Sequence, residues 1–285
     1  MKKSIMTGFL TAAILLSLVG CGSGNSNNKE TIGSASSESV TETVVETASE
    51  AKSETAAETA VSETSAETTS ETEVYDRAKS IEAYKAALEN LNQNGTLPDG
   101  SDLGTSDGYD LSENKFAIYD VDHDGRDELI FCYTTTSMAA MTAKIYDYDE
   151  AGGSLYEELS AFPMLTFYDN AAIGAGVSHN QGYAGEFWPY TFYTYDAAGD
   201  TYQAEYFVDA WDKSISDVNY NGEAFPDDAD KDGDGIVYYL DAPDGSEQGE
   251  PMDKDAYDAW FSENAGSEEE IPFQNFTEEN ISNIQ

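Results

Sequence analysis

The chain has 285 residues and carries 13 Lys and Arg against 56 Asp and Glu, a formal net charge of −43 at pH 7. A surface this acidic repels phosphate backbones and anionic lipid, which argues against nucleic-acid binding. With only 2 Cys and 2 His, the chain cannot form a disulfide-rich scaffold, and a histidine-based zinc site is disfavoured. The acidic excess instead favours solubility and cation binding.

The N-terminus has the features of an export signal. Lys2 and Lys3 precede an apolar run from residue 5 to 19, which is typical of a cleavable secretory signal rather than a membrane span. Leu-Val-Gly-Cys at residues 18–21 resembles the lipobox of bacterial lipoproteins. The resemblance implies that residues 1–20 are a signal peptide and that Cys21 is acylated, with chains such as palmitate. The mature chain would then be lipid-anchored on the extracellular face of the bacterial cell membrane.

Residues 21–73 form a Ser, Thr, Ala and Glu-rich segment after the lipidated Cys, with no aromatic residue. Glu recurs at every fourth position from Glu38 to Glu58. Like charges four residues apart repel on a helix, and Ser and Thr lower helix propensity further. We therefore expect a disordered, extended stalk that spaces the folded part from the membrane, and in this the chain resembles surface lipoproteins of Gram-positive bacteria.

The remaining segment, 74–285, is long enough for one hydrophobic core. Residues 75–91 predict an amphipathic helix, because Ile81, Tyr84, Leu88 and Leu91 share one face. Aromatic and β-branched runs separated by turns then predict short strands at 116–119, 129–133, 143–148, 165–168, 190–195, 202–207 and 236–240. A second short helix is expected over 253–264. The predicted class is α+β, with a twisted antiparallel β-meander between an N-terminal and a short C-terminal helix. Cys132, in one of these strands, is expected to be a buried free thiol.

The first of two acidic loops lies in FAIYDVDHDGRDELIF. Carboxylates at alternate positions, a Gly that allows a sharp turn and a following carbonyl can wrap around one calcium ion, which takes 6–8 oxygens. The predicted ligands are Asp120, Asp122, Asp124, the carbonyl of Arg126, and Glu128. Position 12 holds Phe131, so the EF-hand pattern is incomplete. The stretch resembles the Asp-x-Asp-x-Asp-Gly-x-x-Glu-Leu calcium loops of FG-GAP and VCBS-like extracellular repeats, over some sixteen residues.

The second acidic loop lies in DDADKDGDGIVYYLD and is close to the EF-hand loop pattern. With Asp230 at position 1, the predicted ligands are Asp230, Asp232, Asp234, the carbonyl of Ile236, and Asp241 at position 12. Asp is shorter than the usual Glu at that last position, which weakens bidentate closure. A frame that starts at Asp228 is the alternative. Strand-like residues follow the loop, so we expect a structural site rather than a helix-loop-helix sensor.

Together these features predict a membrane-anchored extracellular lipoprotein with a calcium-stabilised, non-catalytic domain that binds an unidentified ligand, such as a glycan or a protein. The aromatic residues Tyr183, Phe187, Trp188 and Tyr190 form either a binding platform or core. The first alternative function is an extracellular hydrolase that acts on glycan or peptide through carboxylates. A solute-binding protein is a further alternative, although it usually needs two α/β lobes.

A phosphatase is the remaining alternative. Asp120-Val121-Asp122 after an apolar strand also resembles the nucleophile motif of haloacid-dehalogenase-like phosphatases. The resemblance implies Asp120 as nucleophile, Asp122 as acid/base and magnesium as cofactor. That family requires a parallel sheet with crossover helices, which the sequence does not predict.

Overall fold

The computed structural model describes residues 75–104, 110–180 and 182–285, all of which belong to one compact unit of the chain. The predicted signal peptide, the lipidated Cys21 and the stalk lie outside the described residues. No helix in the described part of the chain is long and apolar enough to cross a membrane.

Helices form at both predicted places. Helix α1, Arg77–Asn94, buries Ile81, Tyr84, Leu88 and Leu91 on one side. It ends at Gly95, whose left-handed backbone (φ 67°) lets its N–H bond to the Leu91 carbonyl. Helix α2, Lys254–Asn264, begins where the Asp253 side chain accepts a hydrogen bond from the Ala256 N–H. A third short helix near the C-terminus, α3, Glu278–Ser282, was not predicted.

The strands form two sheets, in which every pairing is antiparallel. The first sheet has the order β11-β1-β2-β3-β4, with bounds Gln274–Asn275, Lys115–Tyr119, Glu128–Tyr133, Thr142–Asp149 and Ser154–Ala161. The second has the order β10-β5-β6-β7-β8-β9, with bounds Glu268–Glu269, Leu165–Tyr168, Ile173–Gly176, Tyr190–Asp196, Thr201–Asp212 and Ile236–Asp241. Two short 3₁₀ turns lie at Leu111–Glu113 and Met138–Ala140.

The predicted α+β class is confirmed, but the meander is divided. Strands β1–β4 and β5–β9 are two separate consecutive meanders, and the C-terminal β10 and β11 add one edge strand to each. Strands β4 and β6 were missed because Glu157 and Glu158 interrupt the first and two glycines weaken the second. The described strands form no parallel sheet of the kind that the phosphatase resemblance implies.

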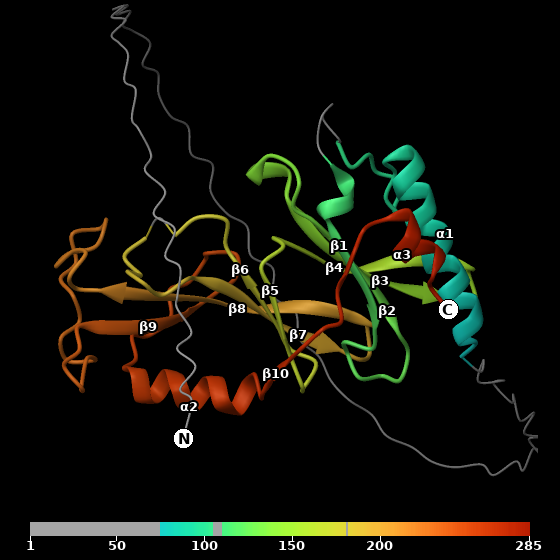
Figure 1. Cartoon of the computed structure of the whole chain (residues 1–285). Coiled ribbons are helices and arrows are strands. Elements are labelled where there is room, and N and C mark those ends of the chain that lie inside the picture. Colours follow the sequence, from blue (N-terminus) through green and yellow to red (C-terminus); the bar gives the residue numbers. More distant parts are fainter. Residues whose placement is uncertain (1–74, 105–109, 181) are drawn as a thin grey trace, which may run out of the picture. The chain divides into compact units, whose positions relative to one another are not determined.

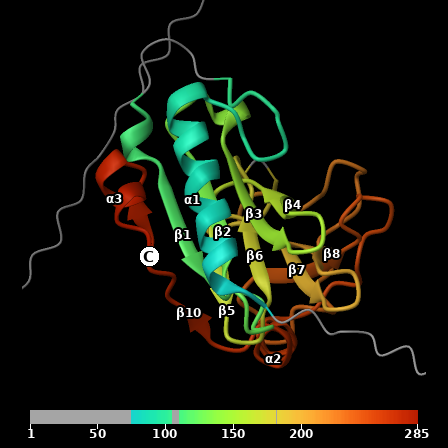
Figure 2. The same cartoon turned by 90° about the vertical axis from the view of Figure 1, so that its right-hand side faces the viewer.

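Alternate residues of the first sheet enter two different cores. One face, with Phe116, Phe131 and Tyr146, packs against α1 and α3, as Figure 2 shows for α1 over this sheet. The opposite face, with Ile130 and Ile145, packs against residues of the second sheet. Helix α2 covers the far face of the second sheet through its aromatic side chains (Figure 1). The layer order is therefore helix, sheet, sheet, helix.

Candidate metal centre

The loop between β1 and β2 carries the first acidic cluster. Carboxylate oxygens of Asp120, Asp122 and Glu128 lie within 4.8 Å of one another. Asp122 is only 5% exposed and Glu128 1%. One Glu128 oxygen accepts a hydrogen bond from the Val121 N–H at 2.8 Å, which fixes the side chain across the loop. Three of the five predicted ligands are thus brought together.

The loop backbone explains how alternate acids can converge. His123 and Gly125, at positions 4 and 6, have positive φ angles of 63° and 92°. The side chain at position 3, Asp122, accepts from the Asp124 N–H at 3.0 Å, and Asp124 accepts from the Arg126 N–H at 2.7 Å. Asp124 is not a member of the converged group. Its second oxygen lies 4.0 Å from Arg126 Nε. The Arg126 carbonyl ligand stays a prediction.

Two further acids, which the sequence analysis missed, reach the same place. Glu158 of β4 and Asp200, in the turn between β7 and β8, have oxygens within 4.8 Å of each other and of Asp122. The centre therefore combines a loop of the first sheet, a strand of that sheet and a turn of the second sheet. Asp122 belongs to both groups.

A β-bulge directs Glu158 inward. The pairing of β3 with β4 passes from Ile145–Leu159 to Tyr146–Glu157, which leaves Glu158 as the extra residue. In a regular strand Glu158 and Leu159 would point to opposite faces, yet both are buried here. The Glu158 carbonyl accepts a hydrogen bond from the Thr201 hydroxyl at 3.0 Å, and this bond ties the bulge to the second sheet.

Burial dominates the electrostatics of these carboxyls. It raises the pKa of Asp122 to about 6, of Glu158 to about 9 and of Glu128 to about 11, and the neighbouring carboxylates add to each shift. Both oxygens of Glu158 are buried without a hydrogen-bond partner among the described residues. Such a site favours a neutral acid or a carboxylate with a bound cation, because an unpaired buried charge is costly.

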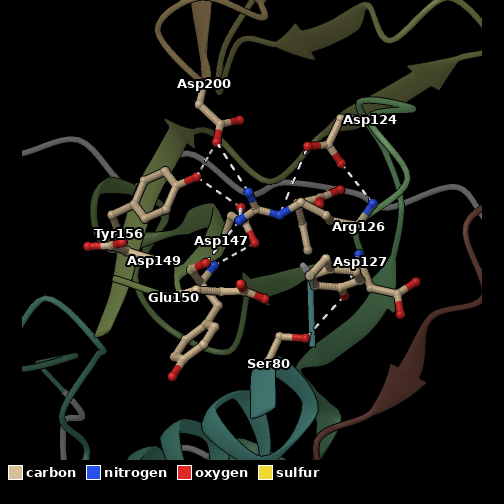
Figure 3. A network of polar contacts seen from close by, with 12 residues as sticks. Ser80, Asp124, Arg126, Asp127, Asp147, Asp149, Glu150, Tyr156 and Asp200 are labelled. Carbon is tan, nitrogen blue, oxygen red and sulfur yellow. Dashed lines mark hydrogen bonds and ion pairs between the residues drawn. The ribbon is translucent and has the colours of Figure 1, made fainter. Parts of the chain in front are cut away.

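Arg126 is the nearest basic side chain, but it serves a neighbouring network (Figure 3). Its guanidinium donates to Asp147 and, at 2.9 Å, to the Tyr148 carbonyl. Asp200 lies 3.9 Å away from it. Burial alone would lower the pKa of Arg126, whereas these carboxylates raise it. Arg126 therefore stays charged and reaches only the Asp200 side of the centre.

The second acidic loop has the same backbone design. Oxygens of Asp230, Asp232 and Asp234 lie within 4.8 Å of one another. Positive φ angles again occur at positions 4 and 6, here Gly233 and Gly235. The side chains at positions 3 and 5 again accept N–H bonds from two residues ahead. This shared pattern favours the frame that starts at Asp230 over the one that starts at Asp228.

The second loop differs from the first in what closes it. Position 9, which is Glu128 in the first loop, is Tyr238 here, and Asp232 and Asp234 are exposed. Ile236 begins β9 and Asp241 ends it, so an extended strand carries Asp241 about 16 Å along the chain. Asp241 is outside the converged group, and it accepts a hydrogen bond from the Gly249 N–H instead. The predicted position-12 ligand therefore does not close this loop, and the Ile236 carbonyl stays a prediction.

The predicted aromatic platform is dispersed. Phe187 and Tyr190 pack in the core beside α2, and Trp188, 43% exposed, donates its indole N–H to the Val177 carbonyl. Tyr183 instead lines a cleft of about 290 Å³ together with Trp211, Tyr220, Tyr239 and several polar side chains. We call this the aromatic cleft.

The centre thus supplies oxygen ligands only, in a buried position between two sheets, and this donor set suits a hard divalent cation. No family model, curated protein or solved structure shows significant similarity to the chain.

Proposed function

We propose that the protein is a calcium-stabilised, non-catalytic ligand-binding lipoprotein on the extracellular face of the bacterial cell membrane. The observation that carries the calcium part is the burial of Asp122, Glu128 and Glu158 in two acidic groups that share Asp122, with no hydrogen-bond partner for either Glu158 oxygen among the described residues. A divalent cation offsets the repulsion between these groups and satisfies their oxygens. Calcium fits best, because its flexible coordination suits carboxylates supplied by a loop and by separate strands.

The cell-surface part depends on the N-terminal sequence. The lipobox resemblance at residues 18–21 and the acidic stalk support export and attachment through Cys21. Intact mass measurement of the chain produced in a bacterial host tests this directly. The expected result is loss of residues 1–20 and added lipid mass on Cys21; a mature chain without that mass would contradict the anchor.

Thermal unfolding tests the calcium part. The full chain is melted in chelator and then at rising calcium, with magnesium as the matched control. We expect a calcium-selective rise in melting temperature that is half complete at about 0.1–1 mM, as for extracellular calcium modules. Asp122→Ala should abolish most of the rise, whereas Asp232→Ala, in the exposed loop, should reduce it far less. An equal response to magnesium would refute calcium binding as the cause.

The aromatic cleft supports the ligand-binding part, with a saccharide as ligand. The Tyr220 ring is 81% exposed and lies 4.6 Å from the Tyr183 ring, which in turn lies 5.6 Å from Trp211. Aromatic faces pack against the C–H surfaces of sugar rings, as they do against other apolar surfaces. Asp209, Asp241, Asn221 and Gln248 line the same cleft and provide hydrogen-bonding groups for hydroxyls.

Calorimetric titration with neutral and amino-sugar oligosaccharides tests this cleft. Tyr220→Ala should weaken binding at least tenfold. Trp188→Ala removes another exposed aromatic outside the cleft and should leave the affinity unchanged. Equal losses in the two variants, or a loss with Trp188→Ala alone, would place the binding elsewhere.

One observation favours the hydrolase alternative as a second candidate function. In the β8–β9 register Asp209 lies opposite Tyr239, so Asp241 is its diagonal neighbour on the same face. The backbones of such diagonal positions are about 7–8 Å apart, which allows side chains on one face to bring their carboxyls to the separation of about 6.5–9.5 Å that inverting glycosidases use. Burial raises the pKa of both carboxyls. The assay is incubation with oligosaccharides and detection of new reducing ends. Release of reducing ends by the parent chain, and its loss in Asp209→Asn, would support hydrolysis over binding alone.

A further inference from the structure

The centre contains two groups of oxygens rather than one. In the first group, the loop acids Asp120 and Glu128 converge with Asp122; in the second, Glu158 and Asp200 converge with Asp122. The oxygens of one calcium ion lie at most about 5 Å apart, since each Ca–O distance is about 2.3–2.6 Å. Within each group one oxygen per residue meets this limit, and at 4.8 Å the five residues fall into these two groups, which share Asp122. The geometry is that of two adjacent positions with Asp122 between them.

Glu158 shows that the second position needs a ligand of its own. It is 4% exposed, and both of its oxygens lack a hydrogen-bond partner in the described part of the chain. The bulge in β4 directs this side chain toward Asp122 and Asp200 rather than toward solvent. A cation in the loop position alone would leave these two buried oxygens without a partner.

Charge balance agrees with two ions. Five carboxylates surround the two positions, and one divalent cation would leave three negative charges uncompensated. Among the described residues, Arg126 is the one basic side chain within 4 Å of any of the five. It approaches only Asp200, at 3.9 Å, and is itself paired with Asp147. A second divalent cation reduces the excess to one negative charge.

We propose that Asp122, Glu158 and Asp200 hold a second calcium ion, which joins the two sheets and shares Asp122 with the ion of the β1–β2 loop. This inference rests on the proposed calcium function. The Asp200 oxygens also accept hydrogen bonds from the hydroxyls of Tyr195 and Tyr156, both at 2.5 Å. These hydroxyls orient the carboxylate and leave it lone pairs for a cation.

Ion counting tests the second position. Native mass spectrometry of the full chain in detergent, at a calcium concentration that saturates the parent, gives the number of bound ions. The single variants Asp120→Asn and Glu158→Gln address the loop position and the inter-sheet position, and each should lose one ion. Their combination should lose two. Asp232→Ala, in the separate exposed loop, identifies any ion bound there, so that it is not counted among the two.

The outcomes separate the inference from the function on which it rests. A double variant that loses only the one ion lost by each single variant would show a single shared ion and overturn the inference alone. A parent chain that binds no calcium would overturn both. Asp200→Asn should repeat the loss seen with Glu158→Gln, and it decides the question should Glu158→Gln fail to fold. An unchanged count in that variant would also overturn the inference.

Discussion

Asp147 joins three parts of the fold, and its removal should be measurable in stability. Asp147 is 1% exposed, and its carboxylate accepts from Arg126 (Figure 3) and from the Tyr148 N–H. The Tyr84 and Tyr156 hydroxyls also lie within hydrogen-bond distance of it, and they share their protons with the Asp127 carbonyl and with Asp200. In Asp147→Asn the volume is kept, but an NH₂ group replaces one oxygen. Whichever way the amide is oriented, one N–H donor, either Arg126 or the Tyr148 backbone, faces the NH₂ group and loses its acceptor, and Arg126 loses its buried counter-charge.

The size of the effect follows from the exposure of the partner. Breaking a buried ion pair typically costs about 3–5 kcal/mol. The Arg126 side chain is 26% exposed, and Asp124 and Asp200 lie 4.0 and 3.9 Å away, so part of the loss is compensated. We expect the free energy of unfolding to fall by about 2–3 kcal/mol. For a domain of this size that corresponds to a drop in melting temperature of about 4–12 °C.

Calorimetric melts in saturating calcium measure this drop. Glu205→Gln is the matched control, because it removes one negative charge from an exposed strand position. Loss of charge from so acidic a chain relieves general repulsion, and the control measures that contribution. A difference between the two variants of less than about 1 kcal/mol would refute the role assigned to the buried carboxylate.

Three further predictions concern other buried groups. In chelator, the free energy of unfolding should be highest near pH 4 and fall toward pH 9. Burial raises the pKa of Asp122 to about 6 and of Glu158 to about 9, above unfolded values of about 4, so ionisation of these groups at higher pH destabilises the folded state. Melts across pH should show a shallower dependence of stability on pH for Glu158→Gln. Burial raises the pKa of the Cys132 thiol to about 12, so a Cys21→Ser chain should react with a thiol reagent at pH 8 only after unfolding; rapid reaction of the native chain would contradict this. Phe276→Ala should lower the free energy of unfolding, measured by chemical denaturation, by about 3–5 kcal/mol. The reason is that Phe276 is 1% exposed in the core between α1 and the first sheet. A loss below about 1 kcal/mol would mean that the C-terminal segment is not needed for that core.

Local sequence patterns were sufficient for the elements with a regular period. Helix α1 and strands β1, β2 and β3 match their predicted ranges within a few residues, because their apolar residues repeat at helical or strand spacing. The acidic loops could also be predicted from the sequence, because alternate Asp residues followed by a Gly at position 6 indicate a turn with a defined backbone conformation. Convergence of Asp120, Asp122 and Glu128 agrees with that pattern.

The rest of the centre depends on contacts between distant residues. Glu158 is recognisable as a buried acid only when the bulge against β3 is known, since in the sequence it is the second of two adjacent Glu residues and nothing distinguishes it from Glu157. Asp200 lies in a turn that is ordinary in sequence and joins the centre only because the second sheet packs against the first. Asp241 has the loop position of a ligand in the sequence, yet it lies outside the converged group. A helix after the loop would return position 12 to the acids, whereas β9 extends away from them.

The two loops therefore share a backbone and differ in what an ion bound to them could stabilise. An ion at Asp122 would contact groups from both sheets. Its release would leave buried carboxylates facing one another without a counter-charge, and the stability of the whole domain should fall. An ion at Asp230, Asp232 and Asp234 would order an exposed loop beside β9. Linkage makes the free energy of unfolding depend on an ion only to the extent that unfolding releases it. The buried centre, with its acids held by a loop, a bulge and a turn, is thus the position at which we expect calcium binding and folding to be coupled.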